Sequence, residues 1–567
     1  MLKPGKERAR RSRCICRLFL SRNNGALWIS PRPPHNNFNL RLVPGDHVRG
    51  KNARFPSLAG ETGDDEQVFL LSNHLAAQPR FILKVTALHA KRIGPTLIPD
   101  RSRVLLRPFR PSTDDISRRI IARVMALPEE EVARLLGQVI GEFSDRHERV
   151  EDYFHKRFAQ VKHHLEPDAT PSPERQMLIG AFFTHEYSPE SAALFNPSIV
   201  PHPDQSGLAK GVLRFIMSLR ATGEGHISSI TFRTGKVSTQ HRITLAPAVP
   251  FVTEPERVPN AAYAKGLFTH KLEEAGVQND FCKRVLAQLH DDFTLKDLHA
   301  VLAASGLTET SDATAAWAAR GILLLAESNY EVNFAPDSRV SQRVLFPSAP
   351  SQSNGIEDAR FVRFQNDDGT FTYYATYTAY DGKITLPQLL ETPDFVHFKF
   401  STLNGPAVQN KGMALFPRKI NGQYVMLSRQ DDENILLMFS DNIHFWQTPK
   451  VLLSPTQPWE FIKLGNCGSP IETEAGWLVL SHGVGAMRKY CLGAFLLDLN
   501  DPTRVIGRLL EPLLAPNEAE REGYVPNVVY TCGALLQGRE LIIPYAMSDS
   551  ATSFATVSLD ELLAAME

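Results

Sequence analysis

Apolar residues recur along this chain with two different periods. From Asp114 to about Leu165 they return every three or four positions, as in EEEVARLLGQVIGEF, which is typical of amphipathic helices. From about Arg175 the pattern changes to short apolar runs separated by Gly, Asn and Asp turns, which is typical of strands. The pattern therefore predicts a small helical module followed by a larger β-rich region.

The β-rich region repeats a unit. The runs FTYYATYTAY, QYVMLSR, GWLVLSHGV and ELIIPYAMS each follow a polar turn, and the turns return roughly every 50 to 60 residues. Several units continue into a further strand. A repeat of this length with several strands is typical of a β-propeller blade, and an irregular β-sandwich is the alternative. A helical stretch at about 258–326 interrupts the repeat between the first two units.

These patterns divide the chain into three parts. Residues 1–90 are basic at their start, show little periodicity and are expected to be poorly ordered. Residues 91–174 are expected to form a strand and the helical module. Residues 175–565 are expected to form the β-propeller with its helical insertion, so that the fold class is mostly β with two helical additions.

The composition narrows the class of partner. Lys+Arg and Asp+Glu both total 62, so bulk charge gives no argument for a nucleic-acid or membrane partner. No apolar run approaches the length of a membrane span. The six cysteines include no CxxC pair, and the histidines no HxH or HExxH spacing, so we expect reduced thiols, no metal and a cytoplasmic protein.

The stretch NGIEDARFVRF contains the candidate chemistry. Glu357 and Asp358 stand side by side before an apolar run, with Arg360 two positions on. Glycoside cleavage usually needs a carboxyl group that protonates the leaving oxygen. Adjacent strand residues point to opposite faces, so one acid is expected to face a pocket while the other is braced by Arg360. A solvated turn with mutually satisfied charges is the alternative.

The same stretch begins a longer resemblance. NGIEDAR followed by YYATYTAYDG resembles glycoside hydrolase family 130, the β-mannoside phosphorylases and related β-1,2-mannosidases. The similarity continues through ALFPRKINGQYVMLSR, GSPIETEAGWLVLSHGV, DLNDPTRVIGR and EREGYVPNVVYTCGA to SFATVSLDELL, and includes FNPSIV and SLRATGEGHISSI before them. It covers most of residues 190–565 in family order.

The resemblance implies a five-bladed β-propeller with the active site in its central depression. It also implies one catalytic aspartate, which maps to Asp358. In the phosphorylases of this family that aspartate protonates the glycosidic oxygen, by way of a mannose hydroxyl. Inorganic phosphate attacks the anomeric carbon with inversion and releases α-mannose 1-phosphate. Phosphate is itself the nucleophile, so the protein needs cations to hold it.

Two sets of binding residues follow from the resemblance. The expected mannose contacts are Asn196, Arg220, Asp381 and Arg360. The expected phosphate contacts are Arg429, His482 and Lys419, with Lys411 and Lys463 as weaker candidates. Ordinary turn roles are the alternative for Asn196, which precedes a proline, and for Lys419, which lies beside an Asn-Gly hairpin signal.

The chain departs from the family pattern at two points. Ser428-Arg429-Gln430 stands where many phosphorylases carry HRP, and Tyr524 where many have an aspartate before VPNVV. These departures put one phosphate contact and one sugar contact in doubt. The hydrolases of the family activate water with glutamates, and the candidates for that role here are Glu460, Glu472 and Glu522.

The sequence thus predicts an enzyme without a cofactor that cleaves β-mannosides, most simply β-1,2-linked, with inorganic phosphate as co-substrate. An inverting β-1,2-mannosidase, a non-catalytic sugar-binding propeller and a structural interaction propeller are the alternatives. No nucleic-acid or membrane partner is expected. The helical module is open to two roles, shaping the acceptor side or forming the interface of a homo-oligomer.

Overall fold

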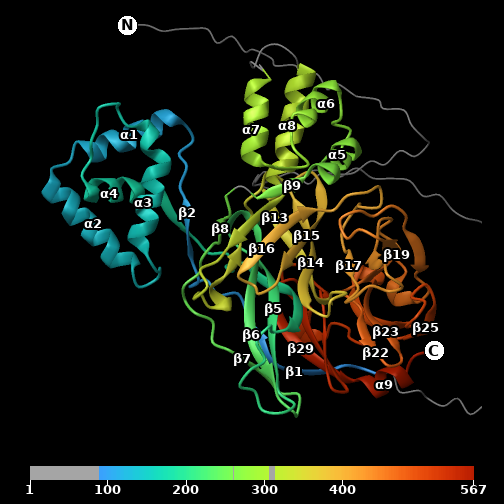
Figure 1. Ribbon diagram of the computed structural model, residues 1–567. Coiled ribbons are helices and arrows are strands. Elements are labelled where there is room, and N and C mark those ends of the chain that lie inside the picture. The colour runs from blue at the N-terminus through green and yellow to red at the C-terminus, as the bar shows by residue number, and fades with distance from the viewer. Residues whose placement is uncertain (1–87, 260, 306–312) are drawn as a thin grey trace, which may run out of the picture. The chain divides into compact units, whose positions relative to one another are not determined.

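The computed structural model describes residues 88–259, 261–305 and 313–567. The extension predicted over residues 1–90 therefore lies outside the described residues, except for its last three positions. The described chain is mostly β and carries two sets of helices (Figure 1). The predicted fold class is confirmed at this level.

The first described elements are two strands, four helices and a third strand. They are β1 (Lys91–Leu97), β2 (Leu105–Pro108), α1 (Asp114–Met125), α2 (Glu129–Phe143), α3 (Val150–Val161), α4 (Pro173–Phe182) and β3 (Thr184–Tyr187), which pairs with β2. Thr113 caps α1 by accepting from the backbone amide of Ile116, and Ser172 caps α4 in the same way. The apolar faces of α1 and α4 meet around Ile121 and Leu178.

Most of the remaining strands form five antiparallel groups in chain order. The first contains β4 (Ala193–Pro201), β5 (Leu213–Thr222), β6 (Ser228–Val237) and β7 (Ile243–Leu245). The second contains β13 (Gly355–Gln365), β14 (Phe371–Tyr380), β15 (Thr385–Thr392) and β16 (His397–Thr402). The third contains β17 (Ala414–Leu415), β18 (Tyr424–Ser428), β19 (Ile435–Ser440) and β20 (Lys450–Leu453).

The fourth group contains β21 (Lys463–Asn466), β22 (Ile471–Thr473), β23 (Gly476–Val484), β24 (Tyr490–Leu497) and β25 (Val505–Arg508). The fifth contains β26 (Val529–Tyr530), β27 (Leu535–Gln537), β28 (Glu540–Met547) and β29 (Ala551–Ser558), and the short helix α9 (Leu559–Ala564) follows it. The strand-forming runs expected from the sequence coincide with β14, β18, β23 and β28.

Strand β1 joins the last of these groups. It pairs antiparallel with β29, with Lys91 opposite Thr556 and Ile93 opposite Phe554. The first two groups touch through a single parallel pairing between Gly355 and Ser228. These pairings define five groups of strands, but they do not show that the groups close around a common axis. The five-bladed propeller therefore stays a prediction.

Four further helices lie between the first two groups in the chain. They are α5 (Lys265–Glu274), α6 (Asp280–Ala287), α7 (Leu295–Ala304) and α8 (Ala313–Glu327). Short strands accompany them: β8 (Glu256–Arg257), β9 (Ala262–Ala264), β10 (Asp292–Thr294), β11 (Tyr330–Asn333) and β12 (Val344–Leu345). The helices share a core of their own that includes Phe268, Val285 and Ile322, and they stand together in Figure 1.

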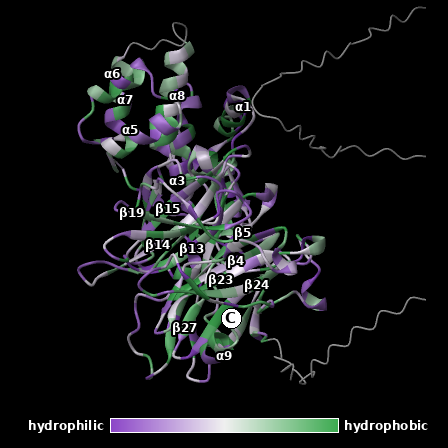
Figure 2. Ribbon diagram, turned by 90° about the vertical axis from the view of Figure 1, so that its right-hand side faces the viewer, coloured by the Kyte–Doolittle hydropathy of each residue, from purple (hydrophilic) through white to green (hydrophobic). Residues whose placement is uncertain are grey.

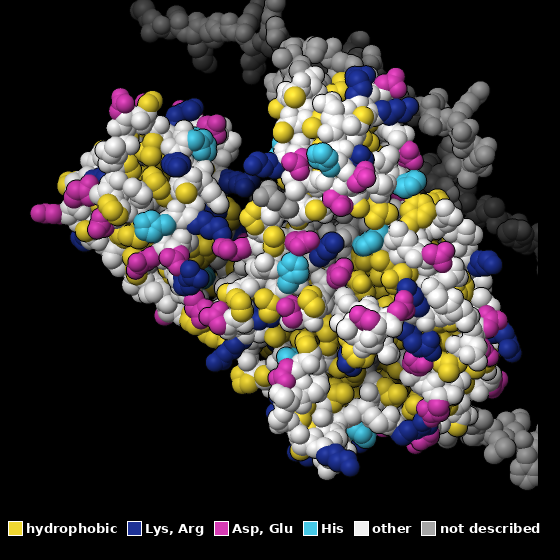
Figure 3. Space-filling model, viewed as in Figure 1, with side chains coloured by type: hydrophobic (Ala, Val, Ile, Leu, Met, Phe, Trp, Pro, Cys, Tyr) yellow, Lys and Arg dark blue, Asp and Glu magenta, His cyan; other side chains and the backbone are white. Residues whose placement is uncertain are grey.

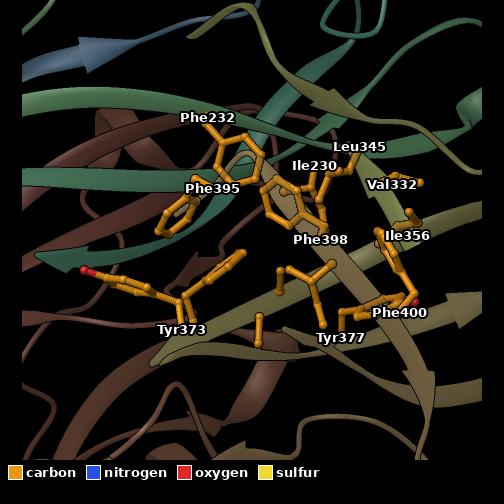
Figure 4. Packing of buried hydrophobic residues seen from close by; sticks show 14 of the residues in the cluster. Ile230, Phe232, Val332, Leu345, Ile356, Tyr373, Tyr377, Phe395, Phe398 and Phe400 are labelled. Atoms are coloured by element: carbon orange, nitrogen blue, oxygen red, sulfur yellow. The ribbon is translucent and has the colours of Figure 1, made fainter. Parts of the chain in front are cut away.

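Aromatic side chains are prominent in the core that the first two strand groups share. Figure 4 shows Phe232, Phe395 and Phe398 packed against one another, and the Phe232 and Phe398 rings lie 6.0 Å apart. Tyr330 and Phe400 stack at 4.4 Å. Such ring pairs add to the free energy gained by burying the rings themselves. Strand β13 joins this core through Ile356, Ala359 and Phe361, which lie on both sides of Asp358 in the strand.

The surface and interior follow the sequence pattern. Hydrophobic colouring lies along strands such as β23 and β27 (Figure 2), which contribute to one buried cluster. Basic and acidic side chains are interspersed on the face drawn in Figure 3. None of the helices in the described ranges has the length and apolar character that a membrane crossing requires.

Candidate active site

Two β-bulges place the central residues of the site. In β13 the pairing with β14 slips between Glu357 and Arg360, and Asp358 in this bulge has a φ of 52°. In β4 the pairing with β5 slips between Phe195 and Ser198, and Asn196 there has a φ of 47°. Asn and Asp tolerate this left-handed region better than other residues with a side chain. Bulges re-aim side chains, and here they bring two predicted site residues together.

The amide of Asn196 is hydrogen-bonded to the carboxylate of Asp358. Its Nδ2 donates to Asp358 Oδ1 at 2.6 Å, and both side chains are buried. The other end of the amide, Asn196 Oδ1, is buried without a hydrogen-bond partner among the described residues. An unsatisfied buried acceptor is costly, and a hydroxyl group of a bound sugar would satisfy it.

Arg220 of β5 lies against both acids. Its Nη2 donates to Glu357 Oε1 at 2.7 Å, and its Nη1 lies 3.5 Å from Asp358 Oδ1. The expectation that the two acids point to opposite faces is therefore wrong at this point, because the bulge turns both toward one guanidinium. Lys411 Nζ lies 3.9 Å from the second oxygen of Glu357, which makes this weaker candidate part of the cluster.

Arg360 occupies a different place from the one expected. It is buried, and its three nitrogens donate to the carbonyl oxygens of Cys467 and Asp358 and to the hydroxyl of Tyr530, at 2.6 to 2.8 Å. It does not brace Glu357. Because each nitrogen is already bonded within the protein, the geometry gives Arg360 the role of holding the Asp358 backbone, and a direct sugar contact stays a prediction.

The charges around Asp358 determine its protonation. Burial alone would raise the pKa of this carboxyl group, but the positive charges of Arg220, Arg360 and Lys411, together with the hydrogen bond from Asn196, hold the pKa well below its ordinary value. Asp358 is therefore ionised at neutral pH in the ligand-free protein. A general-acid role requires a change that restores a proton.

Asp549 is a site residue that the sequence analysis did not select. It lies in the turn between β28 and β29 with a φ of 50°. Burial and the nearby charge of Asp358 raise the pKa of Asp549 to about 6, against the opposing charges of Arg220 and Arg488. A Ser-Asp-Ser turn after a strand was the available sequence signal, but such turns are common.

Arg429 and His482 form a second cluster. Arg429 is buried, its Nε donates to the carbonyl of Lys411 at 3.1 Å, and its Nη1 lies 3.0 Å from His482 Nε2. No described residue accepts a hydrogen bond from its Nη2 or places a carboxylate at ion-pair distance. Gly465 makes room for the pair, since a Cβ there would lie 2.4 Å from the His482 ring.

His482 acts on Arg429. Burial and the charges of Arg429 and Arg360 hold the pKa of His482 well below its ordinary value. The ring is therefore neutral, and its Nε2 accepts a hydrogen bond from Arg429 Nη1. The same ring packs edge-on against Tyr530 at 5.0 Å. Since Tyr530 accepts from Arg360, and Arg360 donates to the backbone of Asp358, the two clusters are connected by contacts.

Two predicted site residues have partners elsewhere. Lys419 pairs with Asp367 at 2.7 Å and lies over the Tyr424 ring. Asp381 accepts from two backbone amides of its own turn, at 2.8 and 2.7 Å. No hydrogen bond or ion pair in the described part of the chain joins either of them to Asp358 or Arg429. Their roles in ligand binding stay predictions without geometric support.

Lys463 and the departures from the family pattern have defined positions. Lys463 Nζ pairs with Asp432 at 2.6 Å. The positive charge of Lys463 also contributes to the lowered pKa of His482. In place of the doubted sugar contact, the hydroxyl of Tyr524 lies 3.2 Å from His226 Nδ1. The Gln430 amide donates to the carbonyl of Ala407 at 2.7 Å.

The glutamates considered for a hydrolase have other partners. Glu460 is buried and pairs with Arg508, and Glu472 pairs with Arg418 at 2.7 Å. Glu522 is exposed. None of the three contacts the Asp358 cluster among the described residues, so the geometry does not support any of these three as a general base for water.

Comparison with known proteins identifies relatives of this chain by sequence. A sequence model described as beta-1,4-mannooligosaccharide phosphorylase matches residues 320–567. The 1,2-beta-oligomannan phosphorylase of Thermoanaerobacter sp. (strain X514) is 35% identical over 245 residues, which cover 42% of this chain and 78% of that protein.

Two further relatives differ in their named linkage. The beta-1,2-mannobiose phosphorylase of Listeria innocua serovar 6a is 33% identical over 231 residues, covering 39% of this chain and 63% of that protein. The beta-1,4-mannooligosaccharide phosphorylase of Ruminococcus albus is 35% identical over 167 residues, covering 27% and 50%. The chain belongs to glycoside hydrolase family 130, the family of β-mannoside phosphorylases that its sequence motifs resemble.

Proposed function

We propose that this protein cleaves β-mannosides by phosphorolysis and releases α-mannose 1-phosphate. The observation that carries the proposal is Arg429, a buried cation for which the described residues provide no carboxylate partner and leave one nitrogen without an acceptor. Burying a cation without a counter-charge is costly, and a phosphate dianion supplies that charge. The names of the relatives, all phosphorylases, support the same reaction.

Asp358 is the proposed proton donor. It is ionised in the ligand-free protein because cations surround it. Phosphate binding at Arg429 adds negative charge near the same cations, and the sugar excludes water. Both changes raise the pKa of a buried carboxyl group. The proton then passes to the leaving glycosidic oxygen while phosphate attacks from the other face of the ring, as inversion requires.

The proposed mannose contacts are the groups that have unused hydrogen-bonding capacity beside Asp358. Asn196 Oδ1 is an acceptor without a partner. Asp549, with a pKa of about 6, exchanges a proton close to neutral pH and can donate to or accept from a hydroxyl. Arg220 contacts both acids of β13, Glu357 and Asp358, and holds them in place.

The linkage we propose is β-1,2. The relatives that match over the greatest lengths of this chain carry that linkage in their names, while the Ruminococcus protein and the family description carry β-1,4. We also propose that the five antiparallel strand groups are the blades of a five-bladed propeller, with β1 completing the last blade. The strand pairing of β1 with β29 supports this arrangement.

Product analysis tests the reaction. β-1,2-Mannobiose and β-1,4-mannobiose are incubated with the protein, with and without inorganic phosphate. The proposal expects mannose 1-phosphate only when phosphate is present, and faster from the β-1,2 substrate. Free mannose formed at equal rates without phosphate would identify a hydrolase, and saccharide binding without turnover a non-catalytic sugar-binding protein.

A further inference from the structure

A cavity of about 400 Å³ lies outside the candidate active site. Its walls come from β2, from α3 with the turn before it, and from residues 252–256, which run into β8 (Figure 1). All of these segments precede the family-matched residues 320–567. The volume falls in the range of small-molecule sites, about 300 to 1,000 Å³.

Arg157 of α3 determines the chemistry of this cavity. Its side chain lines the cavity and is 6% exposed. Its Nη1 donates to the side-chain oxygen of Gln160, while its Nε is buried and has no hydrogen-bond partner within residues 88–259, 261–305 and 313–567. No described carboxylate lies at ion-pair distance from it. The charge of Arg157 acts on Glu254 of the same wall from beyond ion-pair distance, but no anion in the described part of the chain offsets its desolvation by direct contact.

The acids in the cavity wall do not fill that role, because each already has a partner. Glu254 pairs with Arg107, Glu256 with Lys156 at 3.0 Å, and Asp152 with Arg149 at 2.7 Å, and Glu148 accepts from Gln342 at 2.7 Å. Arg110, also in the wall, is exposed and makes no hydrogen bond or ion pair with any described residue. The wall carries four basic and four acidic side chains, and Arg157 and Arg110 are the two guanidinium groups in it that have no ion-pair partner among the described residues.

The same features mark Arg429 in the candidate active site. Seven arginines of the described chain are buried, and three of them pair with carboxylates. Arg343 and Arg360 bond to protein oxygens through all three nitrogens. Arg157 and Arg429 remain as the buried arginines of the described ranges that combine no carboxylate partner with a nitrogen lacking an acceptor.

We propose that this cavity is a second ligand site and binds an anionic sugar, with its phosphate or carboxylate group against Arg157 and Arg110. Arginine suits this role because its planar donors match both kinds of oxyanion. The cavity is much larger than one phosphate ion, and the Glu254 carboxylate and the Tyr153 hydroxyl in its wall can bind sugar hydroxyls. The proposal does not depend on the reaction at Asp358.

Calorimetric titration of the full chain tests the site. The probes are mannose 6-phosphate and glucuronate, which separate phosphate from carboxylate recognition, and neutral glucose as the uncharged control. The expected result is binding of at least one anionic probe, with Arg157→Met weakening it at least tenfold and Arg110→Met a few-fold. Arg429→Met, at the other site, is expected to leave this binding event in place.

Hydrogen exchange locates the binding event independently. An anionic probe is expected to slow amide exchange in α3 of the wild-type protein and of Arg110→Met. If circular dichroism shows that Arg157→Met does not fold, hydrogen exchange still tests whether the probe binds at this cavity. Arg110→Met is suited to this measurement because Arg110 is exposed and its replacement is expected to leave the fold intact. Unchanged affinity in a folded Arg157→Met, loss of binding only in Arg429→Met, or equal binding of glucose would each overturn the proposal.

Discussion

Asn196 and Asp358 are 162 residues apart in the chain, yet the amide of the first donates to the carboxylate of the second at 2.6 Å. Both residues lie in bulges and both have a positive φ. The contact therefore depends on two local backbone distortions, one in each of the first two strand groups. Neither distortion alone would bring the side chains together.

Two replacements of Asn196 distinguish the contribution of its side-chain amide from that of its backbone conformation. Asn196→Gly removes the amide but accepts a φ of 47°, whereas Asn196→Ala removes the amide and adds strain of about 1 kcal/mol. We expect both variants to lose roughly 10- to 100-fold in kcat, and the alanine variant to be less stable than the glycine variant by that strain. Steady-state kinetics and urea unfolding measure the two effects. Wild-type kcat in Asn196→Gly would contradict the role of the amide.

Asp358→Asn is expected to keep the fold and remove general-acid catalysis. Asn tolerates the φ of 52° at this position, and loss of a general acid typically costs about 10² to 10⁴ in rate. Phosphorolysis of mannobiose and of an aryl mannoside with an acidic leaving group are compared. The aryl substrate needs little protonation, so its rate is expected to fall much less. Equal losses on both substrates would argue against proton donation by Asp358.

Asp549 is expected to make stability depend on pH. Its pKa is about 6 in the folded protein and about 3.9 in an unfolded chain, so the folded state binds more proton between these values. Stability from this group is present at low pH and is lost as pH rises through about 4 to 6. Asp549→Asn is therefore expected to exceed the wild type in stability above pH 6, by on the order of 2 kcal/mol, and to match it near pH 3.

Urea unfolding of wild type and Asp549→Asn from pH 3 to 8 measures this difference. Asp367→Asn is the matched control, because Asp367 is an exposed acid paired with Lys419. This variant is not expected to gain stability over the wild type above pH 6. A stability difference between wild type and Asp549→Asn that stays constant across the pH range would contradict the raised pKa.

Arg429 and Lys419 allow a direct comparison of two predicted phosphate residues. Arg429→Met is expected to raise the KM for phosphate about 10- to 100-fold, because charged hydrogen bonds contribute about 1.5 to 3 kcal/mol each. Lys419→Met removes an ion pair with Asp367 outside both clusters and is expected to leave this KM unchanged. Phosphate-dependent kinetics on the two variants, at saturating mannoside, give the answer. A larger effect from Lys419→Met would overturn the assignment.

The sequence predicted the strands well because apolar runs and polar turns are local signals. It also selected Asp358, Asn196 and Arg220, which the structure brings together. The bulges were not predictable, since a shift in register depends on the partner strand and leaves no mark in either sequence alone. For that reason the expectation that Glu357 and Asp358 point to opposite faces was wrong.

The remaining differences concern neighbours distant in the chain. Arg360 was expected at the ligand, but its three partners include Cys467 and Tyr530, more than 100 residues away. Asp549 has its pKa raised by burial and by Asp358, neither of which the sequence shows. Lys419 was selected from its position in a family motif, but it pairs with Asp367 and contacts neither Asp358 nor Arg429 among the described residues. Motifs identified the strand ends that form the site, and tertiary contacts decided which side chains meet there.

The pairing of β1 with β29 also bears on how the molecule is made. On the ribosome, residues 91–97 emerge long before residues 551–558, so an early strand has to wait for its partner until the whole chain between them has been synthesised. Contacts of such long sequence separation slow folding and leave apolar edges exposed meanwhile. The last strand group therefore cannot be completed before β29 has emerged, and a truncated chain that ends before β29 leaves β1 as an unpaired edge open to aggregation.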